Sequence, residues 1–178
     1  MALNQLHDET SGPIKSVFEQ VVREGLDPGS VTGAADSDID RFAAAQGVVC
    51  VPEAVREVLR LVGRRPGIWF AGTAFGVDSV GAGTKRQVVA LLSDVDHELR
   101  DPAGMLVLAA HQGYSYHVID GADLALEDPP VWEVEEPDEV YQGWSSVSAW
   151  FDGTKPSVSE YRAHLAAREM LGLRRLPE

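Results

Sequence analysis

The chain has 178 residues, of which 44% are hydrophobic, and it carries a formal net charge of −13 at pH 7. It is long and apolar enough to bury a core, which excludes a globally disordered protein. Its single cysteine, Cys50, excludes an intramolecular disulfide and a cysteine-rich zinc site, and its valine neighbours predict a buried, inert thiol.

The N-terminal residues 1–9 lack the basic and apolar regions of a secretory signal, so we expect none. No apolar run approaches the ~20 residues that are needed to span a bilayer. With one cysteine and no such segment, the chain is predicted to be a cytoplasmic protein without membrane contact.

Two amphipathic helices are predicted in the first quarter of the chain, after a polar tail. Apolar residues recur at helical spacing over 14–24 and again over 36–46. In the second helix, Asp36 or Ser37 suits the N-cap, and Gly47 suits a left-handed residue after the last turn.

A third predicted helix is the best bounded element of the sequence. Pro52 suits its first position, and Val55–Val62 contains one apolar stripe. Gly63 stands where a left-handed residue would end the helix.

The middle of the chain is less regular. Residues 68–71 are predicted to form a strand, and the glycine-rich residues 72–83 a flexible connection. The spacing of these glycines from Lys85 does not fit a phosphate-binding loop. Residues 85–98 have a helical pattern, with a strand at 88–92 as the alternative.

The second half of the chain is dominated by predicted strands. Residues 105–111 and 114–120 are expected to pair as a hairpin around Gln112-Gly113. Another strand is predicted at 131–134, and residues 138–142 form either a strand or a loop.

Two helices close the chain. The first is capped by Ser145 or Ser146, and the second runs from 157 to 171. The side chains expected in the core are Trp69, Phe70, Trp150 and Phe151. The element order predicts an α+β single domain with a mixed, mostly antiparallel sheet flanked by helices.

The negative charge is concentrated in one interval. Between Arg100 and Lys155 there is no Lys or Arg, whereas eleven acids occur there: Asp101, Asp120, Asp123, Glu127, Asp128, Glu133, Glu135, Glu136, Asp138, Glu139 and Asp152. Such a surface would repel a phosphate backbone, which argues against direct nucleic-acid binding. It would attract a basic protein partner, with an acidic surface kept for solubility as the alternative.

Four segments together resemble the SUKH superfamily, which includes many bacterial immunity proteins and a fungal cell-wall synthesis regulator. They are the helix 36–46 ending at Gly47, the Val51-Pro52 helix start with its stop at Gly63, the hairpin from Gly113 to Asp120, and Ser146–Phe151. The resemblance implies a SUKH-like domain at 31–155, with a tail and helix at 1–30 and a helical extension at 156–178. It also implies a cytoplasmic immunity protein that binds a cognate toxin of a polymorphic toxin system, often a nuclease.

Three functional hypotheses follow. The first is an immunity-type binding protein that neutralises a bacterial toxin, through contact with a basic toxin domain, without enzymatic activity, cofactor or metal. The second is a regulatory or scaffold domain of the same fold that binds a non-toxin protein. The third is an enzyme of unknown type that uses His111 or His117. The oligomeric state stays open.

The predicted contact surface is the acidic segment with its interleaved aromatic residues, a combination typical of protein interfaces. The predicted partner-binding residues are Trp132, Glu133, Glu135, Glu136, Asp138, Glu139, Tyr141 and Trp144. Trp132 and Trp144 are alternatively core residues. His117 and Asp120 are expected to diverge, because side chains three residues apart in a strand point to opposite faces.

Overall fold

The computed structural model describes residues 12–170, so most of the predicted tail and the end of the last helix lie outside the described residues. Its helices are α1 (Pro13–Arg23), η1 (Pro28–Ser30), α2 (Asp36–Ala45), α3 (Glu53–Val62), α4 (Ala82–Leu92), η2 (Gly121–Asp123), α5 (Val147–Gly153) and α6 (Val158–Met170). Its strands are β1 (Thr73–Phe75), β2 (Leu106–His111), β3 (Ser115–Ile119), β4 (Val131–Glu135) and β5 (Glu139–Trp144).

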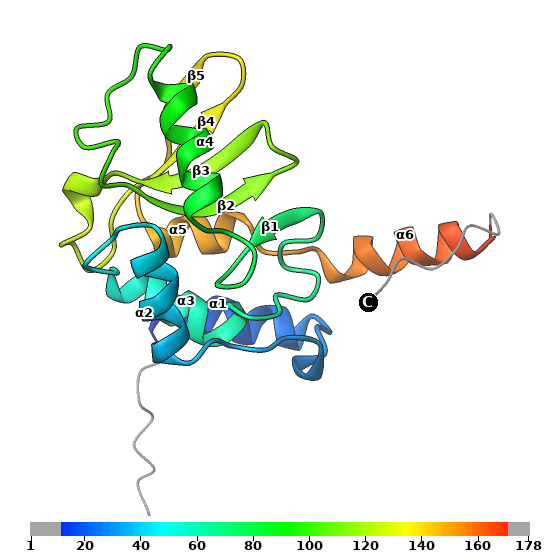
Figure 1. Ribbon diagram of the computed structural model, residues 1–178. Coiled ribbons are helices and arrows are strands. Elements are labelled where there is room, and N and C mark those ends of the chain that lie inside the picture. Colours follow the sequence, from blue (N-terminus) through cyan, green and yellow to red (C-terminus); the bar gives the residue numbers. More distant parts are fainter. Residues whose placement is uncertain (1–11, 171–178) are drawn as a thin grey trace, which may run out of the picture.

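The strands form one sheet in the order β1-β2-β3-β4-β5, and every neighbouring pair is antiparallel. In Figure 1 they follow one another from β1 at the lower right to β5 at the top. The predicted α+β class is confirmed. The predicted hairpin is confirmed as well, since Gln112 and Gly113 have φ values of 48° and 81°, the left-handed pair that a tight hairpin turn needs.

Helices cover the sheet unequally. Figure 1 shows α1, α2 and α3 gathered beneath the sheet, α5 between them and the strands, and α6 projecting from the body. α4 contacts β2, and α5 contacts α1, α3 and β5. None of the helices between residues 12 and 170 is long and apolar enough to cross a membrane.

Stacked aromatic rings join the helices to the sheet. Trp69 stacks on Phe151 with ring centroids 4.2 Å apart, and Phe70 lies 3.9 Å from Phe75 and 5.5 Å from Trp150. All five side chains are buried, which confirms the core residues expected from the sequence. Such pairs add to the stability that burial of their apolar area already supplies.

The prediction of a strand at residues 68–71 is wrong. These residues form turns, and the strand is β1, three residues long, inside the segment predicted as a flexible connection. Adjacent side chains of a strand point to opposite faces, whereas Trp69 and Phe70 both reach the aromatic core. The helix predicted over residues 85–98 is confirmed in part as α4, which begins earlier, at Ala82, and already ends at Leu92.

Several local predictions about α2 and α3 are corrected. The N-cap of α2 is Ala35, whose N–H donates to the Asp38 carboxylate at 3.3 Å. Pro52 is the N-cap of α3, one position before the predicted one. The backbone of Gly63 has a right-handed conformation, with φ −72°, so the left-handed residue predicted there is wrong. The backbone of Gly47 is left-handed, as predicted, with φ 67°.

Cys50 is exposed, so the prediction of a buried thiol is wrong. It lies in the irregular link between α2 and α3, where its Sγ is 3.5 Å from the carbonyl oxygen of Leu124. The apolar neighbours in sequence misled the prediction, since Val49 beside it is also fully exposed.

The first and last helices of the described chain differ in how much they contribute to the core. α1 contributes Ile14 and Val21 to the core, at 1% and 0% exposure, although the sequence assigns it to the N-terminal segment. In α6, only Val158 is buried.

Candidate functional site

The predicted contact residues all lie on the β4–β5 hairpin, which ends the sheet. The turn between the two strands is the yellow loop near the top of Figure 1. β4 pairs with β3 on one side and β5 on the other, and β5 pairs with β4 alone. The structure therefore brings the predicted residues together on one edge of the protein.

Four carboxylates of the hairpin face solvent. Glu136, Asp138 and Glu139 are exposed, and Glu135 is half-buried. Within the described part of the chain, none of the four forms an ion pair. Their negative charge is therefore not compensated by an ion pair within residues 12–170.

Glu133 has a different environment from these four. Its side chain is only 17% exposed, and it accepts a hydrogen bond from the Ser115 hydroxyl at 3.2 Å. Its Oε1 also lies 3.7 Å from Nε2 of His117, and the Tyr141 hydroxyl is within hydrogen-bonding reach. Glu133 is thus committed to contacts inside the protein, which the sequence did not indicate.

His117 links Glu133 to the core. The Trp150 indole N–H donates to Nδ1 of His117 at 2.9 Å, so the proton of the neutral ring is on Nε2, on the side of Glu133. Burial lowers the pKa of His117, and the Glu133 carboxylate offsets this only in part. The imidazole is therefore held neutral.

The three aromatic residues of the predicted surface are placed differently. Trp144 packs its ring 4.9 Å from that of His117, and Trp132 packs against the core with its indole N–H buried. Tyr141 is 42% exposed. Partial burial and the neighbouring carboxylates raise the pKa of Tyr141 to about 12, which keeps its hydroxyl protonated. Tyr141 is the one exposed residue of these three.

The two strand histidines lie on the same face of the sheet but have separate partners. Nδ1 of His111 is 2.8 Å from the Thr73 hydroxyl, and His117 contacts Trp150. The Ser115 hydroxyl donates to Glu133, not to a histidine, so the hydroxyl paired with an imidazole here is that of Thr73. No set of three or more His, Cys, Asp or Glu in residues 12–170 is placed to hold a metal ion.

Asp120 follows β3 as the N-cap of η2, and its partners differ from those of His117, from which it was predicted to diverge. Its carboxylate is 1% exposed and accepts hydrogen bonds from the backbone N–H groups of Arg100, Asp101 and Ala122. Burial acts to raise the pKa of Asp120, but the three donors together with the charge of Arg100 outweigh burial and lower it. The role of Asp120 is to fix the loops at the end of β3.

Asp36, Asp38 and Asp40 of α2 and Glu53 of α3 are paired with arginines of the same protein, unlike the four exposed or half-buried carboxylates of the hairpin. Arg60 binds Asp36 at 2.9 Å and Glu53 at 2.6 Å, and Arg56 binds Asp40 at 2.7 Å. These pairs join residues far apart in the sequence, so composition alone could not reveal them.

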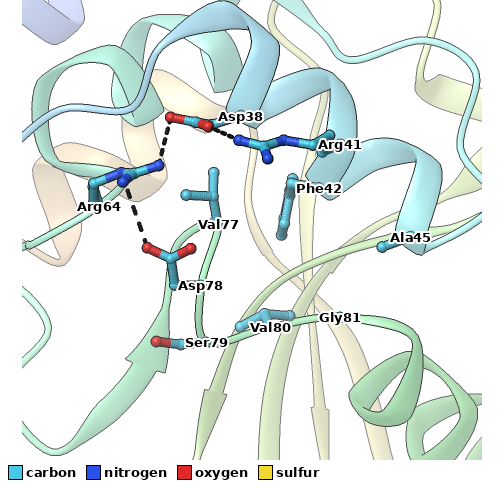
Figure 2. Close-up of a pocket in the computed structure, with 10 residues that line it drawn as sticks. All are labelled: Asp38, Arg41, Phe42, Ala45, Arg64, Val77, Asp78, Ser79, Val80 and Gly81. Atoms are coloured by element: carbon cyan, nitrogen blue, oxygen red, sulfur yellow. Dashed lines mark hydrogen bonds and ion pairs between the residues drawn. The ribbon is translucent and has the colours of Figure 1, made fainter.

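Further ion pairs line a hollow of about 640 Å³ between α2 and the turn before α4 (Figure 2). Figure 2 shows Asp38 between Arg41 and Arg64, and Arg64 reaching on to Asp78, with Phe42 and Val80 as apolar lining. Two arginines and two aspartates leave no net charge. The hollow therefore offers no clear preference for a charged ligand.

Lys85, at the end of the glycine-rich segment, is not directed at a phosphate-sized site. Its ammonium is buried and donates to the carbonyl oxygen of Gln46 at 2.6 Å. The side-chain amide of Gln46 in turn donates to the C=O of Val107 in β2 and accepts from the N–H of the same residue. This buried connection between α2, α4 and the sheet is structural.

No protein-family model matches the sequence, and a comparison with curated proteins finds no significant match.

Proposed function

We propose that the chain is an immunity-type binding protein that neutralises a cognate bacterial toxin by direct contact, and that the β4–β5 hairpin is its contact surface. The observation that carries the proposal is the set of four hairpin carboxylates, Glu135, Glu136, Asp138 and Glu139, which have no ion-pair partner among residues 12–170. An unneutralised acidic surface attracts a basic partner and accelerates the encounter.

The contrast with α2 and α3 supports this choice of surface. Asp36, Asp40 and Glu53 bind arginines within the protein, so they add little to the field that a partner meets. On the hairpin, an exposed tyrosine stands beside the free carboxylates. An aromatic anchor with a charged rim is a common arrangement at protein interfaces.

The likeness of four segments to the SUKH superfamily supports the proposed kind of partner. Those segments form α2, α3, the β2–β3 hairpin and α5, which build the body that holds the contact surface. Blocking a toxin requires only a standard-size interface of ~1,600 Å² in total.

The proposal is tested with the protein encoded by the adjacent open reading frame, which we expect to contain a basic toxin domain. In the variant Glu136→Lys/Glu139→Lys, the two exposed carboxylates become cations, and we expect affinity to fall at least about tenfold, mainly through slower association. Association of the wild type should also slow as salt is added. Biolayer interferometry at several salt concentrations measures both effects.

The matched control is Asp94→Lys/Glu98→Lys. These two exposed residues lie in the loop after α4, and their reversal changes the net charge by the same amount. The control should bind within about twofold of the wild type. Equal loss of binding in both variants would mean that only the net charge of the protein matters for binding. If the protein encoded by the adjacent reading frame is not a toxin, the regulatory or scaffold alternative is favoured.

Glu133 is unsuitable for this test. Reversing its charge would place a cation beside His117 and Ser115. A loss of binding would then report damage to the hairpin.

A further inference from the structure

The outer edge of β5 is open. β5 is the last strand of the sheet, and no backbone hydrogen bond from elsewhere in residues 12–170 reaches Glu139–Trp144. The strand also contains neither lysine nor proline, the residues that commonly protect a sheet edge. An edge of this kind can accept a further strand.

The register identifies which backbone groups point outward. The N–H of Glu136 donates to the carbonyl of Tyr114, and hydrogen-bonded and non-bonded pairs alternate along an antiparallel ladder. The N–H groups of Glu133 and Glu135 therefore face β5, where they pair opposite Tyr141 and Glu139.

The remaining backbone groups of β5 alternate to the other side. The N–H and C=O of Val140 and Gln142 point away from β4, to the free edge. These two residues supply the donors and acceptors that a sixth strand would use.

Side chains along the edge define the chemistry of that strand. Glu139 and Tyr141 share one face of the hairpin with Glu135, whereas Val140 and Gln142 lie on the opposite face. An added strand would meet negative charge on the first face and the partly buried Val140 on the second. A segment in which basic and apolar residues alternate fits both.

We infer that an extended basic segment of the partner protein pairs with the outer edge of β5 and extends the sheet by one strand. This inference rests on the proposed function and names the part of the partner that the hairpin would hold. A second copy of the chain fits less well, because the interface would bring together two hairpins with uncompensated negative charge.

The decisive variant is Gln142→Pro in the full chain. Proline removes the outward N–H and places a ring on the free edge. By the alternation of the ladder, Gln142 lies at a non-bonded position opposite Trp132, just before the register irregularity at Val131, so the bonds to β4 stay intact. Gln142→Ala is the matched control, since it removes the exposed side chain and keeps the N–H.

The probe is an eight-residue peptide of alternating lysine and valine, labelled for fluorescence anisotropy. We expect Gln142→Pro to weaken its binding at least about tenfold and Gln142→Ala by less than about twofold. A glutamate–valine peptide of the same length should not bind. Equal binding by the proline variant and the wild type would overturn the inference.

Amide hydrogen exchange of the wild type tests the same inference without a substitution. Val140 and Gln142 should exchange quickly in the free protein and become protected when the lysine–valine peptide is bound. Protection elsewhere, or dimerisation of the wild type through this edge with no peptide binding, would contradict the basic segment as occupant. If the neighbouring toxin domain binds and the proline variant binds it equally well, edge pairing fails while the proposed function stands.

Discussion

His117 connects the acidic hairpin to the interior of the protein. Its Nδ1 accepts from Trp150 of α5, its Nε2 faces Glu133 of β4, and its ring packs against Trp144 of β5. Only the neutral imidazole can accept the indole hydrogen bond, because protonation would occupy Nδ1. The packing of the hairpin against α5 therefore depends on the charge state of His117.

We expect the stability of the protein to fall as pH drops below about 6.5, in part through His117. The unfolded chain protonates this residue at its ordinary pKa of 6.5, whereas burial lowers the pKa in the folded state. The unfolded state therefore binds more protons below pH 6.5, and the free energy of unfolding decreases as pH falls through the folded pKa. Above pH 6.5 this contribution is fully present.

Urea denaturation at intervals between about pH 7 and pH 5 measures this effect. The control His117→Asn keeps an acceptor for Trp150 and does not titrate, so its free energy of unfolding should change less over the same range. Parallel curves for the two proteins would assign the pH dependence to other groups.

Among the elements, α5 holds the base of the hairpin. It is only seven residues long, too short to be stable alone, so its cap and its packing decide whether it forms. Trp150 and Phe151 are at most 1% exposed, and Ser146 accepts the N–H of Ala149 at 3.0 Å. Burial and cap together fix the position from which Trp150 reaches His117.

The substitution Ser146→Ala should lower the free energy of unfolding by about 1 kcal/mol, because the first turn of α5 loses its side-chain cap. Ser145→Ala is the control, since the exposed Ser145 precedes the cap, and its effect should stay within about 0.5 kcal/mol. Thermal and urea unfolding measure both variants. Similar losses in the two would mean that the cap is not the source of the stability.

At the scale of the whole molecule, two acidic regions differ in how their charge is compensated. Asp36, Asp38 and Asp40 of α2 bind arginines of the same region, whereas four carboxylates of the hairpin at the far edge of the sheet form no ion pair among residues 12–170. The two terminal helices are equally distinct, since α1 packs into the core and α6 projects from the body (Figure 1).

Removing the two terminal helices should lower the free energy of unfolding by very different amounts. A chain that ends at Ser159 keeps the buried Val158 and loses the bond from Arg162 to Gly25, so its free energy of unfolding should change by less than about 1 kcal/mol. A chain without residues 1–24 loses Ile14 and Val21 from the core and should lose several times that amount, at ~2–5 kcal/mol for each large cavity. Circular dichroism during urea unfolding compares the two.

Local signals account for the elements that could be predicted from the sequence. The apolar stripe of α3 and the two left-handed residues of the β2–β3 turn need only a few neighbouring residues, and both structures occur as predicted. The segment around Trp69 and Phe70 could not be predicted in this way, because its conformation depends on rings supplied by β1 and α5.

The sequence by itself determined the α+β class, most of the helices and strands, and the concentration of acids between Arg100 and Lys155, because periodicity and charge are properties of the chain. Only the tertiary structure decided which acids are free. Glu133 and Glu136 lie three residues apart, yet one is held by His117 and Ser115 and the other is exposed. Strand register and packing separate them, and these arise from contacts between residues that are distant in the sequence.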